Sequence, residues 1–375
     1  MMKVYLTGYK NKNLGDDLFF ITVLERYPHI TFVFEDKPSC FYAKLFKGYK
    51  NVEVLPCFKV NLLQRIKNKI IRSVHKNWSG QYYSLYQKKN KIKVDAYLRI
   101  GGSIFMEPKN NKTFIKNRFI AEKKYFGEIP FLYVGCNFGP YSSSNYFKNA
   151  EFVIYNCSSI CFRDTYSYGL FKQSKNVRVA PDVLFGMKRS DPCTKKKEKS
   201  LGISLINLST RSSLAKYYRS YMESISSYIQ YKYNDLELIR LFSFCEPEGD
   251  VKAIEDLKSI LPDMIKDKIE VVTYDGDYRT FLEKFSEVEL LLATRFHAMI
   301  LGFVYGIKTV PIIYSDKMTH VLNDIDQEVP SIRLQNMSKE ILLETIAHSK
   351  IIDVNNEIRD SQMQFVDVDN LLNLK

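Results

Sequence analysis

The sequence has 375 residues, of which 45% are hydrophobic, and its formal net charge is +13. This length exceeds what one hydrophobic core usually serves, so we expect two domains, and the surplus of Lys and Arg indicates an acidic partner of unspecified kind. The sequence has seven Cys, an odd number, and they lack metal-ligand spacing. We therefore expect reduced thiols, with neither disulfides nor a structural zinc site. No segment approaches the roughly 20 apolar residues of a membrane span.

Residues 1–187 show strand and helix patterns in alternation, and residues 1–8 lack the apolar core of a signal peptide. Residues 17–27 and 40–48 predict helices. The predicted strands lie at 3–7, 31–35, 52–55, 95–100 and 129–135. This alternation is typical of βαβ units in a parallel sheet, whose loops open at one edge. The pattern predicts an N-terminal Rossmann-like domain.

The second half repeats the pattern after a dense run of charge at 188–200, which predicts an interdomain linker. Residues 201–337 predict a second Rossmann-like domain. Its predicted strands lie at 201–205, 236–242, 269–273, 290–293 and 309–314, and its predicted helices at 214–231, 251–260 and 298–305. Residues 338–375 predict a helical tail, whose acidic end we expect to pack on the first domain. The predicted class is α/β, with two Rossmann-like domains facing a cleft.

A strongly basic segment, residues 55–94, contains no acidic residue. On a helical wheel its apolar side chains cover one side, while Arg65, Lys69, Arg72 and Lys76 lie on the other. This pattern is typical of a helix that lies on an anionic membrane, and also of a surface helix packed on a sheet. No recognised nucleic-acid-binding motif accompanies the charge, so we expect no nucleic-acid partner.

Arg295 and His297 follow the apolar run 290–293, where a buried strand is predicted to become a helix. Open α/β sheets bind ligands at the carboxyl ends of their strands. Arg offers a fork of donors with a permanent charge, and His exchanges a proton near neutral pH. An isolated His can equally be a structural residue, but the pair suits an anionic ligand that must be protonated.

The first predicted strand runs into a turn that contains Gly15, Asp16 and Asp17. Gly15 can adopt backbone shapes that other residues avoid, and an Asp at a helix start caps exposed N–H groups. Capping accounts for one carboxylate, so the other is a candidate general base. The turn has neither the dinucleotide-binding nor the P-loop spacing of glycines.

Two further loops carry candidate ligand-binding groups. Gly101, Gly102 and Ser103 can direct backbone N–H groups toward a carboxylate or phosphate at the helix that follows. Arg163 is a second Arg at a predicted strand end, and we interpret it as ligand-binding in preference to a surface ion pair. Asp182 follows Pro181, and we interpret it as part of a turn.

In their order and spacing these motifs resemble the polysaccharide pyruvyl transferase family over roughly residues 2–320. The resemblance rests on Asn13-Leu-Gly-Asp-Asp17, Gly101-Gly-Ser, Arg163 to Ser167, Pro181-Asp182 and Arg295-Phe-His297, with Pro311 and Lys317 beyond. It implies a GT-B-like fold and transfer of pyruvate from phosphoenolpyruvate to two sugar hydroxyls, giving a cyclic ketal. Members often place an Arg just after the strand that opens the second domain. Here that role falls to Asn207 or to Arg211.

The resemblance implies that Arg295 and His297 serve donor binding and catalysis. Bidentate Arg groups match the carboxylate and phosphate of phosphoenolpyruvate. We expect His297 to be the acid, Asp16 or Asp17 the base, and Lys317 a phosphate ligand. Neither a metal nor a cofactor beyond the donor is expected.

The predicted acceptor is a sugar of a cell-surface polysaccharide precursor, such as one for capsule or exopolysaccharide. We expect the enzyme to act on it in the cytoplasm. A lipid-linked acceptor would place the enzyme at the inner face of the plasma membrane, where the basic segment can contact anionic lipid. Two alternatives stay open. One is a GT-B glycosyltransferase that uses a nucleotide sugar, and the other is a noncatalytic binder of anionic glycans.

Overall fold

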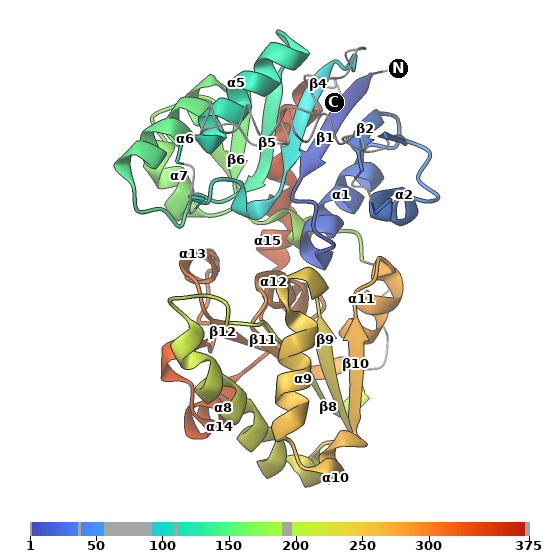
Figure 1. The fold of residues 1–375 in the computed structure, drawn as a ribbon, viewed down its shortest axis with the longest axis vertical. Coiled ribbons are helices and arrows are strands. Elements are labelled where there is room, and N and C mark those ends of the chain that lie inside the picture. Colours follow the sequence, from blue (N-terminus) through green and yellow to red (C-terminus); the bar gives the residue numbers. More distant parts are fainter. Residues whose placement is uncertain (1, 37–38, 56–91, 109–111, 190–196, 372–375) are drawn as a thin grey trace, which may run out of the picture. The chain divides into compact units, whose positions relative to one another are not determined.

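The computed structural model describes residues 2–36, 39–55, 92–108, 112–189 and 197–371 (Figure 1). Most of the basic segment, including Arg65, Lys69, Arg72 and Lys76, lies outside these residues. The chain divides into two compact units. Unit 1 comprises Met1–Tyr9, Phe19–Val183 and Gln362–Lys375, and unit 2 comprises Lys10–Leu18 and Leu184–Ser361. The turn that carries Asp16 and Asp17 therefore belongs to unit 2, whereas the sequence placed it in the first domain.

Unit 1 is built on a parallel sheet of seven strands in the order β3-β2-β1-β4-β5-β6-β7. The strands are β1 (Lys3–Gly8), β2 (Thr31–Glu35), β3 (Val52–Leu55), β4 (Ala96–Ile100), β5 (Phe131–Cys136), β6 (Ser159–Phe162) and β7 (Val177–Val179). Its described helices include α2 (Phe41–Leu45), α5 (Phe114–Phe126), α6 (Ser144–Asn156) and α7 (Thr165–Phe171). Helix α1 (Leu14–Arg26) begins in unit 2 and belongs to unit 1 from Phe19 onward. Every residue of β4, β5 and β6 is buried, as expected of a parallel sheet covered on both faces.

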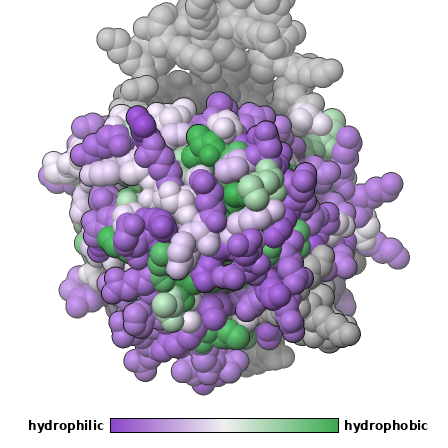
Figure 2. Space-filling view, turned by 90° about the horizontal axis from the view of Figure 1, so that it is seen from below, coloured by the Kyte–Doolittle hydropathy of each residue, from purple (hydrophilic) through white to green (hydrophobic). Residues whose placement is uncertain are grey.

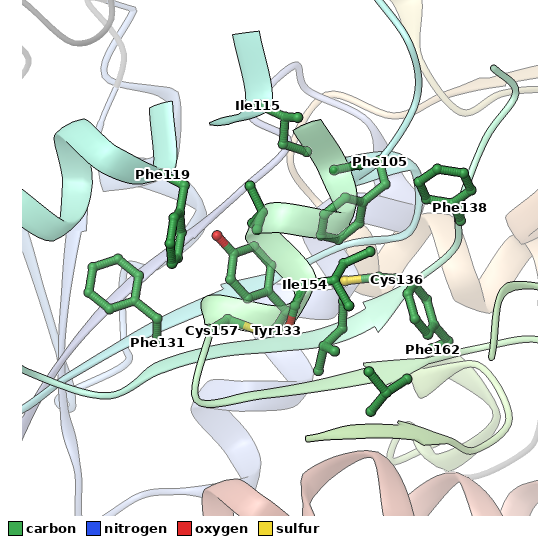
Figure 3. Close-up of a cluster of buried hydrophobic side chains, with 14 of the residues drawn as sticks. Phe105, Ile115, Phe119, Phe131, Tyr133, Cys136, Phe138, Ile154, Cys157 and Phe162 are labelled. Atoms are coloured by element: carbon green, nitrogen blue, oxygen red, sulfur yellow. Dashed lines mark hydrogen bonds between the residues drawn. The ribbon is translucent and has the colours of Figure 1, made fainter. Parts of the chain in front are cut away.

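Aromatic side chains dominate the core of unit 1 (Figure 3). The rings of Tyr97 and Phe131, on neighbouring strands, stack with centroids 4.5 Å apart. Phe119 of α5 meets Phe131 edge-on at 5.7 Å, and Phe138 meets Phe171 of α7 at 4.9 Å. Such offset and edge-on pairs add stability beyond the burial of their area. Much of the high aromatic content thus serves core packing.

The acidic end of the chain packs on unit 1, as the sequence predicts. In α16 (Val366–Leu371), Asp369 accepts hydrogen bonds from Arg26 at 2.8 Å and Tyr27 at 2.6 Å, and Asp367 pairs with Arg178 at 2.7 Å. The part of the tail before residue 362 belongs to unit 2, where α14 (Lys339–His348) packs on α8 (Tyr218–Tyr231). The tail at 338–375 is therefore shared between the units.

Unit 2 is a six-stranded parallel sheet in the order β10-β9-β8-β11-β12-β13. Its strands are β8 (Lys197–Ser204), β9 (Leu238–Ser243), β10 (Ile269–Thr273), β11 (Val288–Ala293), β12 (Lys308–Ile313) and β13 (Ile332–Arg333). Its helices include α8 (Tyr218–Tyr231), α9 (Asp250–Ile260), α10 (Asp263–Lys266), α11 (Tyr278–Ser286), α12 (Phe296–Val304), α13 (Asp316–Asp324) and α15 (Asn355–Asp360). The central strands β8 and β11 pair from Leu290 with Leu201 to Ala293 with Ser204. These pairs align the carboxyl ends that carry the site.

The predicted linker at 188–200 is too long at its carboxyl end, because β8 already begins at Lys197. Lys197 pairs with Val288 of β11, and the N–H of Lys199 donates to Glu289 at 2.7 Å. The ladder uses backbone groups, so exposed charged side chains at the start of a strand do not prevent pairing. The charged residues at 197–199 were therefore assigned to the linker although they begin strand β8.

The surface seen in Figure 2 is mainly hydrophilic, with apolar residues in small separate groups. Scattered apolar residues of this kind are normal on soluble proteins and identify no docking surface. Within the described ranges, none of the helices has the length and apolarity needed to cross a bilayer.

Candidate functional site

The predicted Arg-x-His element lies at the turn between β11 and α12, in unit 2. The N–H of Arg295, the N-cap residue of α12, donates to Ser204 Oγ at 3.0 Å, and the N–H of Thr294 donates to the carbonyl of Ser204 at 3.2 Å. The Thr294 hydroxyl shares a 2.8 Å hydrogen bond with Tyr221 of α8. Contacts to two neighbouring elements therefore fix the start of α12, which carries His297.

Arg295 is only 7% exposed, and its guanidinium forms ion pairs with two carboxylates. Its Nε donates to Asp250 at 3.0 Å, and its terminal nitrogens contact Asp250 and Glu248. Asp250 also accepts the N–H groups of Phe244 and Cys245 at 3.0 and 2.9 Å. Burial raises the pKa of Asp250, and the charge of Arg295 opposes that shift. The charge of Arg295 is thus balanced by protein partners.

His297 lies directly against Gly15 in the first turn of α1. A Cβ atom added to Gly15 would overlap the Nδ1, Cγ and Cβ atoms of His297. The N–H of Leu14 donates to the carbonyl of Phe244 at 3.0 Å, which fixes this turn beyond β9. Close packing against the imidazole thus gives a reason for a glycine at this position. The prediction that Gly15 belongs to the substrate-binding residues stays a prediction.

The adjacent carboxylates of Asp16 and Asp17 have different surroundings. Asp17 is 1% exposed and accepts a 3.0 Å hydrogen bond from the hydroxyl of Tyr274. Asp16 is partly exposed and follows the glycine that contacts His297. Both lie in the first turn of α1, where the helix dipole favours negative charge. Asp17 therefore has a buried structural contact, whereas Asp16 is accessible to solvent.

A group of cations lies at the carboxyl end of β12. The guanidinium of Arg211 stands 5.2 Å from the ring centroid of Tyr314, and its NH2 is 3.8 Å from Glu248. Lys317, in the first turn of α13, places its Nζ 5.4 Å from the ring of Phe296, the neighbour of His297. Both cations are partly exposed. They supply positive charge near the start of α12, which carries His297.

The alternatives Asn207 and Arg211 have different surroundings. Asn207 is buried, and its side-chain amide oxygen accepts from the N–H of Ser209 at 3.0 Å and from the Ser209 hydroxyl at 2.6 Å. It therefore stabilises a turn. Arg211 is the residue of the two that faces Tyr314 and Glu248.

Four predicted site residues, Gly101, Gly102, Ser103 and Arg163, belong to unit 1. The N–H of Gly101 donates to Val134 at 3.2 Å, so it is used inside the sheet and does not extend toward a ligand. The segment that follows, Gly102–Ile104, is a single 3-10 turn, which corrects the predicted anion-binding helix start. Ser103 is exposed.

Arg163 is buried, with 2% of its surface exposed, so its ion pair is not the surface pair considered from sequence. It donates to Asp182 at 2.8 Å and to Asn137 at 2.6 Å. A Cβ atom on Gly102 would overlap its guanidinium, so this glycine permits the close approach. The sequence pattern predicts that Asp182 is part of a turn. In the structure it is also the buried counter-charge of Arg163. A substrate contact by Arg163 stays a prediction.

Sequence reasoning missed Glu248, Asp250, Tyr274 and Tyr314. The carboxylate pair had a physical signal, because a buried Arg requires counter-charges. Nothing in the spacing indicated that these would come from the start of α9. Within the described residues, His, Cys, Asp and Glu side chains form no group of three suited to a metal ion.

Two parallel-sheet α/β units define a GT-B-like fold. Solved structures with this fold include Anabaena HepE in complex with UDP and glucose, with 12% identity, a TM-score of 0.56, and coverage of 100% of this chain and 98% of that chain. UDP-N-acetylglucosamine 2-epimerase from Rickettsia bellii has 12% identity, a TM-score of 0.59, and coverage of 99% and 96%. For the MnaA–UDP structure from S. aureus the values are 12%, 0.58, 100% and 98%.

The family is shown by sequence. The family model described as "Polysaccharide pyruvyl transferase" matches residues 13–316, which include all the site residues of unit 2 except Lys317. This chain belongs to the polysaccharide pyruvyl transferase family. No curated protein gave a significant match.

Proposed function

We propose that this protein transfers pyruvate from phosphoenolpyruvate to two hydroxyls of one sugar in a cell-surface polysaccharide precursor, forming a cyclic ketal. The family supports pyruvylation of polysaccharide in general. One observation carries the finer proposal. In unit 2, His297 contacts the turn that bears Asp16, while the cations Arg211 and Lys317 lie at the end of the neighbouring strand.

The donor is held by the partly exposed cations. Lys317 and Arg211 bind its phosphate and carboxylate, since charge-assisted hydrogen bonds to such groups are strong. Arg295, predicted from sequence to anchor the donor, has Asp250 and Glu248 as partners. Its main role is therefore to hold the turn that carries His297. Loss of Arg295 is expected to affect the fold of this turn as much as donor binding.

The chemistry proceeds through proton transfers by His297 and Asp16. His297 protonates the methylene carbon of the donor, which leaves a cationic centre stabilised by the adjacent oxygen. A sugar hydroxyl attacks the cationic carbon, which carries the phosphate oxygen, and loses its proton to Asp16. The bond to the phosphate oxygen then breaks, and phosphate leaves with the electron pair. The second hydroxyl closes the ring and returns a proton to His297. These steps use no metal and no further cofactor.

The acceptor is proposed to be a lipid-linked oligosaccharide handled at the cytoplasmic face of the membrane. This proposal rests on the sequence of the basic segment, residues 55–94, which lies almost wholly outside the described residues. Each Lys or Arg near an anionic leaflet contributes about 1 kcal/mol of attraction.

A second candidate function is glycosyl transfer from a nucleotide sugar. It is favoured by one finding, that HepE with this fold was solved with UDP and glucose, and MnaA with UDP. The same fold supports many activities, so it does not decide between these two.

Calorimetric titration of phosphoenolpyruvate and, separately, of UDP-glucose into the protein distinguishes the two candidates. We expect phosphoenolpyruvate to bind and Lys317→Ala to weaken it by about tenfold or more, because one charge-assisted contact is lost. Lys308→Ala, at the other end of β12, is the matched control and should bind normally. Binding of UDP-glucose without phosphoenolpyruvate would overturn the proposal.

A further inference from the structure

Tyr314 follows β12 and is not used in the steps above, although it lies among the donor-binding cations. It is 9% exposed, and the guanidinium of Arg211 stands 5.2 Å from its ring centroid. Lys317 and Arg295 also act electrostatically on this phenol. Tyr314 therefore lies beside the groups that are proposed to hold the donor.

The charged groups around Tyr314 come from four elements. Lys317 extends from α13, Arg295 from the start of α12, and Arg211 from the loop after β8, while Glu248 is the one acidic contributor among them. Burial alone raises the pKa of the Tyr314 phenol, but the three cations outweigh it, so the pKa lies below its usual value. The surroundings therefore favour release of a proton from this hydroxyl.

The proposed reaction, on which this inference rests, requires one more proton donor than the steps above supply. The two sugar hydroxyls lose two protons, and one of these ends on the methyl carbon through His297. The other must end on phosphate, because the ester dianion departs as monohydrogen phosphate at neutral pH. Asp16 accepts a proton and cannot also be that donor in the same step.

We propose that Tyr314 is the general acid that protonates the departing phosphate. The C–O bond to phosphate breaks, its electron pair stays on the phosphate oxygen, and that oxygen takes the proton of the Tyr314 hydroxyl. The resulting phenolate is stabilised by Lys317 and Arg211. It regains a proton from solvent, which has received one from Asp16. Arg211 itself cannot donate, because guanidinium does not lose its proton.

The test compares turnover of the wild type, Tyr314→Phe and the control Tyr231→Phe, whose phenol is exposed on α8. Phosphoenolpyruvate is the donor, and aryl glycosides with free hydroxyls are the acceptors. General acid catalysis contributes about a hundredfold, so Tyr314→Phe should lower kcat by about that factor. KM should change little, because the cations remain. Tyr231→Phe should match the wild type.

The pH profile gives a readout that a packing role would not move. Only protonated Tyr314 is active, so wild-type kcat should fall as pH rises through a pKa below that of ordinary tyrosine. Tyr314→Phe should lose this alkaline limb. With sulfoenolpyruvate, whose sulfate leaves without a proton, the defect of Tyr314→Phe should largely disappear.

The outcomes separate this inference from the proposed function. A wild type that releases no phosphate from phosphoenolpyruvate with any acceptor removes the proposed function. An active wild type without an alkaline limb, or with Tyr314→Phe within threefold of its kcat, overturns the inference alone. So does a leaving-group-dependent defect found in Lys317→Arg in place of Tyr314→Phe, since it would make the lysine the acid.

Discussion

At the scale of single residues, the site of unit 2 has two layers with different exposure. Asp16, His297, Arg211 and Lys317 are partly exposed. The residues that hold them, Asp17, Asp250, Arg295 and Tyr221, are buried and hydrogen-bonded to other buried side chains or to backbone groups. Reactive groups held by a bonded, buried layer keep their geometry through the reaction.

Gly15→Ala is the sharpest test of the contact with His297. The new methyl group would overlap the imidazole, so we expect the ring to shift and kcat to fall by about a hundredfold, because small misplacement of a catalytic group is costly. Gly169→Ala in α7 is the control, because a Cβ atom there meets open space. Turnover and thermal unfolding are measured for both. Normal turnover in Gly15→Ala would remove His297 from the mechanism or show that its ring position is unimportant.

Asp16→Asn and Asp17→Asn should separate the two carboxylates. Asp16→Asn is expected to lower kcat by about a hundredfold with unchanged stability, because it removes a base. Asp17→Asn weakens the contact to Tyr274, so it should lower the free energy of unfolding by about 1 kcal/mol or more. Steady-state kinetics and urea unfolding measure the two effects. Equal, mild effects in both variants would contradict the assignment of the base.

At the scale of elements, the chain end is joined to the sheet of unit 1 through Gln364. This side chain is fully buried, and its oxygen accepts the N–H of Gly135 at 2.9 Å. Its nitrogen donates to the carbonyls of Phe162 at 3.1 Å, Ala180 at 2.7 Å and Pro181 at 3.1 Å. One amide thus connects the ends of β5, β6 and β7.

Gln364→Leu should therefore lower the free energy of unfolding by about 3 kcal/mol, because it leaves several buried backbone groups without partners. Gln335→Leu, at an exposed position, is the matched control and should change little. Urea unfolding of both variants measures the difference. A Gln364→Leu protein as stable as the control would show that the tail contributes little to unit 1.

The strands were predictable because buried parallel strands are short, continuous apolar runs, as in β4, β5 and β11. Arg295 and His297 were predictable because a polar pair after such a run falls at a ligand-binding edge. The partners of Arg295 were not, since Glu248 and Asp250 lie more than forty residues earlier and are brought together only by the fold. For the same reason, sequence could not distinguish Asp16 from Asp17 or reveal the burial of Arg163.

At the scale of the whole molecule, the net charge of +13 is the reason to propose membrane contact. It is also the reason to consider a noncatalytic binder of anionic glycans as an alternative. Vesicles that contain anionic lipid should bind the protein at low salt. Changing Arg65, Lys69, Arg72 and Lys76 to Gln should abolish this binding, at about 1 kcal/mol per residue, without loss of activity on a soluble acceptor. In a control variant, the exposed residues Lys47, Lys50, Lys172 and Lys175 are changed to Gln, which removes the same amount of charge. Equal cosedimentation of both variants would contradict a specific role for the basic segment.

The central claim is that His297 protonates the methylene carbon of the donor, while two sugar hydroxyls form bonds to the adjacent carbon that carries the phosphate. The most direct measurement is NMR of the product formed from phosphoenolpyruvate and an aryl glycoside in D₂O. The account predicts a cyclic ketal whose methyl group carries one deuterium, and little of it with His297→Ala. Transfer of a glycosyl group from a nucleotide sugar with the phosphoenolpyruvate left intact, or equal ketal formation by His297→Ala, would contradict the account.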